Sequence, residues 1–249
     1  PMTRLECIMK KFVTDASFWE LFDGASFGVV VARGMKPAAD VAPEDAAAIA
    51  QLLARANAQA GRHLESPTLS ENAPVRVWRQ AYQRFKTKRG ARCSIENLLR
   101  RVLKGNPVGS ISPSVDIYNA ISLKYALPLG GEDIDAFQGD LILRVTEGGD
   151  DFTPLGEGAE NDPTLPGELA YLDDAGAVCR CWNWRDGVRT ALTDETENAF
   201  LIVECADPAR VEDCRAATDE LAELVERHLG ATIAVKELVT GENREVAIA

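Results

Sequence analysis

The chain has 249 residues, of which 46% are hydrophobic and 27% are charged, and its formal net charge is −12. These values are typical of a globular protein with one large domain or two small ones, and they exclude a disordered or fibrous chain. No apolar run approaches the roughly 18 residues that cross a membrane, and residues 1–11 lack the layout of a signal peptide. We therefore expect a cytoplasmic protein with no membrane partner.

The residues that most often build metal or nucleophile sites are sparse and scattered. His63 and His228 are far apart, and no zinc-ligand spacing, phosphate-binding P-loop or Gly-x-Ser-x-Gly motif is present. The six cysteines form no Cys-x-x-Cys pair, which favours buried, reduced thiols over a disulfide framework; they are Cys7, Cys93, Cys179, Cys181, Cys205 and Cys214. We expect no metal, no cofactor and no Ser-His-Asp triad.

Charge is distributed unevenly along the chain. Residues 76–104 contain ten basic residues and one acid, Glu96, whereas residues 130–174 contain thirteen acids and one base, Arg144. The net charge taken alone argues against binding to any nucleic acid, but a local basic surface is enough to hold RNA phosphates, and we expect no DNA partner. Two interpretations remain open: an RNA-binding surface, or a solvated face that offsets the acidic segment.

The first half of the chain carries mostly helical signals. Asp15 is a candidate N-cap, Pro43 and Pro74 suit first helical turns, and Ser94 is a candidate cap for a further helix. The spacing of Val75, Trp78, Tyr82 and Phe85 predicts an amphipathic helix whose aromatic stripe faces the core. Helices are expected over 16–22, 43–60, 74–85, 94–104 and 112–124, with one buried strand over 27–32.

The second half carries mostly strand signals. Strands are expected over 141–145, 168–172, 178–184, 200–205 and 232–239, with a long helix over 208–229 that ends at Gly230. Gly130-Gly131 and Gly148-Gly149 are expected in turns. The pattern lacks regular βαβ alternation, which favours an α+β fold. We predict one domain over 1–249, with a helical N-terminal half packed on a β-rich C-terminal half.

Several segments resemble a known family. Ser110–Leu129 (SISPSVDIYNAISLKYALPL), Gly139–Arg144 (GDLILR) and Thr193–Asn198 (TDETEN) are similar, in order and spacing, to the B3/B4 editing module of the phenylalanyl-tRNA synthetase β subunit. Freestanding B3/B4 proteins are more similar still, in segments that match Ser94–Arg101 (SIENLLRR), Val115–Asn119 (VDIYN), Gly167-Glu168 and Trp182–Arg185 (WNWR). The resemblance is strongest over 94–204, and it implies a single B3/B4-like domain.

The resemblance implies a function connected with tRNA. In the synthetase, the module hydrolyses mischarged aminoacyl-tRNA, so one expectation is a deacylase that acts in trans on the aminoacylated 3′ end. A second is a module that binds an amino acid or tRNA without turnover, and a third is a small-molecule enzyme on a reused fold. Asn119 matches the family motif, whereas Gly130 stands where that motif has His and Tyr118 stands where it has Thr.

Candidate site residues follow from these segments. Ester hydrolysis needs a hold on the amino acid, a placed water and donors for the oxyanion, and Asp116 and Asn119 lie near one helix face. We assign Asn119 and Asp116 to catalysis and Tyr118, Asn183, Arg185 and Glu168 to substrate binding. Alternation along a strand would place Asn183 and Arg185 on one face.

Structural roles remain the alternatives for these residues. Asp116 suits a capping acid, Asn119 suits a helix residue bonded to nearby backbone, and Glu168 suits a surface acid. Asn183 and Arg185 would then form an exposed polar face behind a buried tryptophan pair. The residues expected to contact tRNA are Arg84, Lys86, Lys88, Arg89, Arg100, Arg101 and Lys104, in a monomer.

Overall fold

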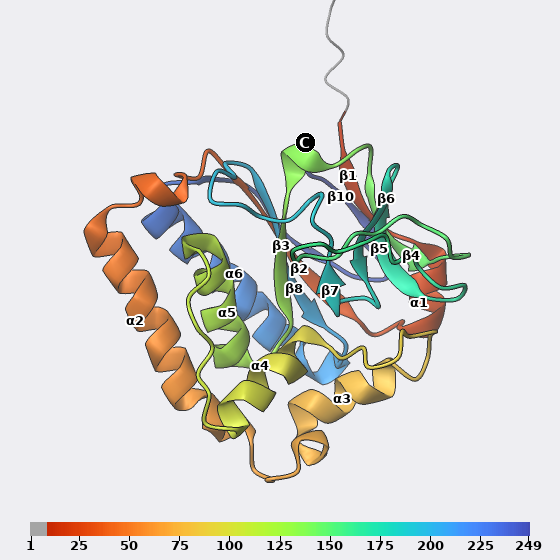
Figure 1. The fold of residues 1–249 in the computed structure, drawn as a ribbon, viewed down its shortest axis with the longest axis horizontal. Helices are drawn as coiled ribbons and strands as arrows, with labels where there is room; N and C mark the ends of the chain where they lie inside the picture. The colour runs from red at the N-terminus through yellow and green to blue at the C-terminus, as the bar shows by residue number, and fades with distance from the viewer. Residues whose placement is uncertain (1–8) are drawn as a thin grey trace, which may run out of the picture.

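The computed structural model describes residues 9–249, whose strands form two sheets (Figure 1). Sheet A has the order β10 (Glu245–Ala247), β1 (Lys11–Thr14), β4 (Leu141–Val145), β5 (Leu169–Asp173), β6 (Gly176–Arg180) and β7 (Arg185–Asp186). Sheet B has the order β3 (Leu129–Asp133), β8 (Ala199–Cys205), β2 (Ser26–Arg33) and β9 (Thr232–Val239). Only β1 and β4 pair in parallel; every other pair of neighbouring named strands is antiparallel.

The described residues form six α-helices, which are α1 (Ala16–Leu21), α2 (Pro43–Gln59), α3 (Ala73–Ala81), α4 (Ser94–Leu103), α5 (Pro113–Tyr125) and α6 (Val211–Leu229). Helices α5 and α6 pack on sheet B, whereas α1 packs against β4 of sheet A. Helices α2, α5 and α6 lie side by side, and α6 packs directly on β2 (Figure 1). A Cβ at Gly28 of β2 would lie 1.7 Å from Thr218 Oγ1 of α6, so a glycine is needed where this helix approaches the strand.

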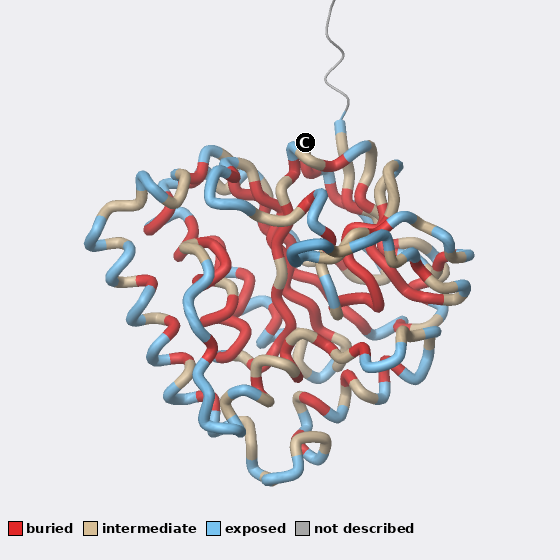
Figure 2. Tube along the Cα trace, viewed as in Figure 1, coloured by how far each residue is buried: buried red, intermediate tan, exposed pale blue. Residues whose placement is uncertain are grey.

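The central strands are buried on both faces (Figure 2). Alternate residues of β2 enter different cores: Phe27, Val29 and Val31 pack between the sheets, whereas Val30 and Ala32 pack beneath the helices. Strand β8 divides in the same way. This two-sided burial explains why the sequence shows continuous apolar runs here and not an alternation of apolar and polar residues.

The α+β prediction is confirmed, and most elements lie within two residues of their expected ends. Two local assignments are wrong. Gly130 and Gly131 lie in β3, not in a turn, and they pair with Ile202 and Leu201 of β8. A glycine is needed at position 131 because a Cβ there would lie within 2.8 Å of the side chains of Leu192 and Leu201. The N-cap of α4 is Cys93, and Ser94 is the first helical residue.

The expected strand over 178–184 ends early. Strand β6 stops at Arg180, and the chain turns through Cys181 and Trp182, whose φ angles of 48° and 65° are left-handed. Such angles are uncommon for residues with bulky side chains, and the turn returns the chain as β7. Trp182 thereby enters an aromatic cluster with Phe18, Phe22, Phe27 and Trp78.

Two further expectations concern thiols and membranes. The five cysteines from Cys93 to Cys214 are buried and free, as expected of reduced thiols, while Cys7 lies outside the described residues. No helix within residues 9–249 is both long and apolar enough to span a membrane.

Candidate ligand pocket

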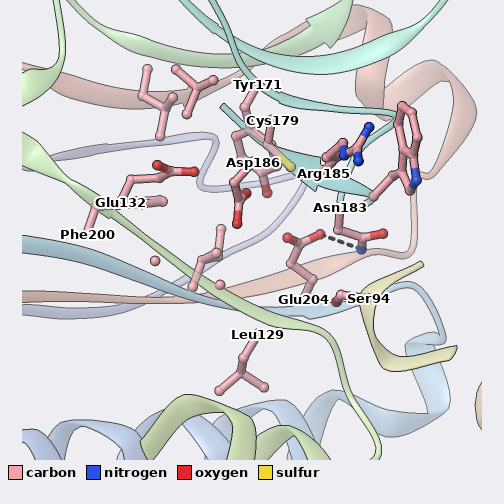
Figure 3. Close-up of a pocket in the computed structure, with 16 residues that line it drawn as sticks. Ser94, Leu129, Glu132, Tyr171, Cys179, Asn183, Arg185, Asp186, Phe200 and Glu204 are labelled. Carbon is pink, nitrogen blue, oxygen red and sulfur yellow. Dashed lines mark hydrogen bonds between the residues drawn. The ribbon is translucent and has the colours of Figure 1, made fainter. Parts of the chain in front are cut away.

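A pocket lies between the two sheets, with about 510 Å³ of space not filled by atoms, its open mouth included (Figure 3). Sheet B contributes one wall through β3 and β8, and sheet A contributes the other through β4 to β7. The first residue of α4, Ser94, closes one end. The lining residues are Ser94, Leu129, Gly130, Gly131, Glu132, Leu141, Tyr171, Val178, Cys179, Asn183, Trp184, Arg185, Asp186, Phe200, Ile202 and Glu204.

Three carboxyl groups line this pocket: Glu132 from β3, Asp186 from β7 and Glu204 from β8. Figure 3 shows Asp186 between the two glutamates, and its charge raises the pKa of both. Burial is the main cause of the raised pKa of each carboxyl. It raises the pKa of Glu132 well above its ordinary value, raises that of Asp186, and raises that of Glu204 to about 8. Burial therefore favours the protonated form of all three carboxyls, and Glu204 is the one whose pKa lies near neutral pH.

A polar cluster surrounds Glu204. Asn183 Nδ2 donates to Glu204 Oε2 at 3.0 Å, and the Tyr82 hydroxyl donates to Asn183 Oδ1 at 2.6 Å. Tyr171 and Trp182 point their donors toward the same carboxyl and partly lower its pKa. Buried polar groups are nearly always hydrogen-bonded, yet three atoms here have no partner: Ser94 Oγ, Tyr171 Oη and Trp182 Nε1.

The mouth of the pocket has a different character. Arg185 is the exposed member of the lining and the only basic one, and its guanidinium carbon lies 5.5 Å from the centre of the Trp184 ring. Opposite, Gly130 leaves open space, because a Cβ built there would have no atom within 4 Å. The pocket is thus accessible beside Arg185 and Gly130, and it is closed and acidic further in.

The structure brings only some of the sequence-predicted residues together. Asn183 and Arg185 line the pocket, and Tyr118 of α5 is close enough that Asp186 and Glu132, after burial, raise its pKa. Asn119 and Asp116 are buried on α5 but are not among the lining residues. Instead, Asp116 accepts from Ser110 Oγ at 2.5 Å and from the backbone nitrogen of Ile111 at 2.7 Å, which holds the loop before the helix.

Glu168 lies in a buried ion pair outside the pocket lining. Both Glu168 and Arg180 are 0% exposed, and the guanidinium donates to both carboxylate oxygens at 2.9 and 2.8 Å. The same carboxylate accepts from the backbone nitrogens of Leu165 and Cys181 at 2.8 and 3.0 Å. Its bonds therefore join the turn at 165–168 to residues 180–181, and it is not a surface acid.

The basic segment lies on and around α3 and α4. Three arginines converge on the buried carboxylate of Glu96, which accepts from Arg79 at 2.7 Å and from Arg100 at 2.8 Å, with Arg92 at 3.7 Å. Lys88 pairs with Asp162, and Arg84 lies over the Phe22 ring. Within residues 9–249, four further predicted RNA contacts are exposed and make no ion pair: Lys86, Arg89, Arg101 and Lys104.

Sequence reasoning missed the three pocket carboxyls. Glu204 had a usable signal, since it interrupts an otherwise apolar run, FLIVEC, that forms β8. Glu132 and Asp186 had none, because they resemble the many other acids of this chain. In the described part of the chain, no group of three or more His, Cys, Asp or Glu residues is arranged to hold a metal ion.

The fold and this pocket define an α+β protein with an acidic cavity between two sheets. The profile of one family, the B3/4 domain, matches residues 77–234. Since the match covers more than half of the chain, this chain belongs to the B3/4 domain family.

Among curated proteins, the phenylalanine–tRNA ligase β subunit of Pectobacterium atrosepticum is 29% identical over 108 residues, covering 43% of this chain and 13% of that protein. The β subunit of Fusobacterium nucleatum is 28% identical over 111 residues, covering 45% of this chain and 13% of that protein. The chain thus matches only about an eighth of each relative's length. Among solved structures, an N-terminal fragment of the β subunit from Pyrococcus horikoshii has a TM-score of 0.47 at 12% identity, covering 94% of this chain and 52% of that one.

Proposed function

We propose that this protein hydrolyses the ester bond of mischarged aminoacyl-tRNA in trans, with the pocket between the sheets as its active site. Membership of the B3/4 domain family and similarity to the phenylalanine–tRNA ligase β subunits support a function linked to tRNA synthetases. The competing proposal from the sequence is a module that binds an amino acid or tRNA without turnover.

One observation favours an ester as the ligand: three carboxyl groups line the pocket against a single arginine at its mouth. Burial favours the neutral form of these carboxyls, and a bound ammonium would favour their ionised form. The carboxylate of a free amino acid would oppose that ionisation and would be repelled by the charge that it produces. An aminoacyl ester keeps the ammonium but has no carboxylate, so the acidic pocket attracts it without that penalty. The pocket therefore suits the aminoacyl end of a charged tRNA better than a free amino acid.

The chemistry can be assigned to groups near the mouth. Water adds to the ester carbonyl carbon, the bond to the ribose oxygen breaks, and that oxygen takes up a proton. We assign the acceptor of the water's proton to Asp186, which is half-buried in the lining, and the stabilisation of the oxyanion to the guanidinium of Arg185. Glu132 holds the α-ammonium, and a ribose hydroxyl of the substrate assists. No metal and no covalent intermediate are required.

The basic segment is connected to the pocket through α4. Ser94 lines the pocket, and its backbone nitrogen donates to the carbonyl of Asn183 at 3.1 Å. Because Ser94 lies at the closed end, RNA whose 3′ end enters the mouth would extend over the surface to reach the exposed side chains of Lys86, Arg89 and Arg101 in this segment. These lysines and arginines would neutralise phosphates, so binding should weaken as salt rises.

A deacylation panel over the full set of aminoacyl-tRNAs tests the proposal. We expect at least one substrate to be hydrolysed well above its spontaneous rate, and Arg185→Gln to slow that reaction by about a hundredfold. The matched control is Glu223→Gln on the exposed face of α6, which should leave the rate unchanged. Failure to hydrolyse any aminoacyl-tRNA, together with binding of an amino acid or tRNA, would establish the binding module instead.

A second variant separates the pocket from the site first inferred on α5. Because Asn119 is not among the lining residues, Asn119→Ala should slow deacylation less than Arg185→Gln does. A larger loss from Asn119→Ala, with the fold intact by circular dichroism, would return the catalytic assignment to α5.

A further inference from the structure

We infer that the pocket selects aminoacyl esters whose side chain ends in an ammonium group, with Glu204 receiving that group at the closed end. This inference rests on the proposed function and names the substrate class of the same site.

The carboxyls are spread along the pocket. In the ladder between β3 and β8, Glu132 lies opposite Phe200, and Glu204 is four residues further along β8. Phe200, Ile202 and Glu204 point to the same side of the strand because side chains alternate, so the two glutamates begin about 13 Å apart along it. Asp186 lies between them (Figure 3). A ligand with two separated positive groups could pair with both glutamates, whereas a ligand with a single ammonium would leave one of the two glutamates without a partner.

The closed end also lacks partners for its polar atoms. Tyr171 is 4% exposed and lines the pocket, and its hydroxyl points toward Glu204 without completing a hydrogen bond of ordinary geometry, while the buried Ser94 Oγ has no partner. Asn183 already bonds to Tyr82 and Glu204, so it orients the Glu204 carboxyl. An ammonium has three N–H donors and no acceptor. It would therefore donate to Glu204, Tyr171 and Ser94 together, which an apolar side chain cannot do.

The middle of the pocket suits the methylene chain of such a ligand. Leu141, Val178, Phe200 and Ile202 supply apolar surface between the two acidic ends. At the mouth, Gly130 adds room that any other residue would occupy. The order of surfaces is thus acidic, apolar and acidic, which matches the order of groups in a diamino acid.

Titration calorimetry with small amides tests the inference without any turnover. Lysinamide and norleucinamide have the same six-carbon chain and differ only at its last carbon, which carries an ammonium group in lysinamide and a hydrogen in norleucinamide. We expect lysinamide to bind about tenfold or more tightly, since a site built for hydrogen bonds rejects the analogue that lacks them. Equal affinities for the two amides would overturn the inference.

Variants locate the two ammonium positions. Glu204→Gln keeps the size of the side chain and should remove the preference for lysinamide while norleucinamide still binds. Gly130→Leu should block both ligands with the fold retained, because a side chain at this position meets no atom at its Cβ. If Glu204→Gln leaves the preference intact, the side-chain ammonium is not held at the closed end and the inference fails.

A diamine without an acyl group tests whether the ligand is an aminoacyl ester or a free polyamine. Cadaverine presents two ammonium groups but no α-carbonyl, and we expect it to bind more weakly than lysinamide. Binding as tight as that of lysinamide would make a free polyamine the ligand and overturn the inference of an aminoacyl ester.

The deacylation panel then separates this inference from the proposed function. We expect lysyl-tRNA and ornithyl-tRNA to be hydrolysed faster than norleucyl-tRNA. Hydrolysis only of apolar aminoacyl-tRNAs would overturn the substrate class while the deacylase function stands. Tight lysinamide binding with no hydrolysis of any ester would overturn the deacylase function while supporting the ammonium preference.

Discussion

The substitution Glu168→Gln tests whether Glu168 has a structural role. Its carboxylate and the Arg180 guanidinium are both 0% exposed, and they share two hydrogen bonds of 2.9 and 2.8 Å. Glutamine keeps the shape but removes the negative charge, and its NH₂ group cannot accept the bonds from Arg180 and from a backbone nitrogen that the oxygen it replaces accepts now. Arg180 would then rely on Asp162, whose side chain is 34% exposed.

Breaking one side of a buried ion pair costs about 3–5 kcal/mol, because the remaining charge stays buried without its partner. We expect Glu168→Gln to lower the free energy of unfolding by about 3 kcal/mol, at the lower end because Asp162 still lies 3.0 Å from Arg180. Urea unfolding followed by circular dichroism measures this change.

The matched control is Glu223→Gln, which breaks the exposed pair with Arg227, whose side chains are 59% and 60% exposed. Exposed pairs contribute about 0–1 kcal/mol, so this variant should unfold close to the wild type. A loss below about 1 kcal/mol for Glu168→Gln would refute the structural role and return Glu168 to the list of substrate-binding candidates.

Three further predictions concern the pocket, the basic segment and the core. The pKa of Glu204 is raised from 4.5 to about 8, so between these pH values the folded protein holds a proton that the unfolded chain releases. The free energy of unfolding should therefore fall by a few kcal/mol as pH rises from about 4.5 to 8, as measured by urea unfolding. The variant Glu204→Gln should show a smaller fall over the same pH range. Arg101→Glu should weaken tRNA binding in a filter assay without loss of stability. Arg100→Glu should also lower the melting temperature, because Arg100 pairs with the buried Glu96. Equal melting temperatures for the two variants would contradict this prediction. Gly28→Ala should destabilise by about 1–3 kcal/mol through its clash with the Thr218 side chain, and adding Thr218→Ala should recover part of the loss in a double-mutant cycle.

Elements whose signals are local could be predicted from the amino-acid sequence. Asp15 accepts from the backbone nitrogen of Ser17 as the cap of α1, Pro43 and Pro113 begin α2 and α5, and Gly230 ends α6 with a left-handed φ of 66°. These signals depend on backbone geometry within one or two turns, so neighbouring residues suffice to predict them. The family resemblance, carried by contiguous motifs, was accessible for the same reason.

Only the tertiary structure decided the composition of the pocket. Glu132, Asp186 and Glu204 come from three strands of two sheets, and burial between those sheets is what raises their pKa values. Glu168 became an ion-pair residue through Arg180, which lies twelve residues away on a neighbouring strand. Burial and pairing depend on segments that meet only when the sheets pack together, so the pattern of residues along the chain does not encode them locally.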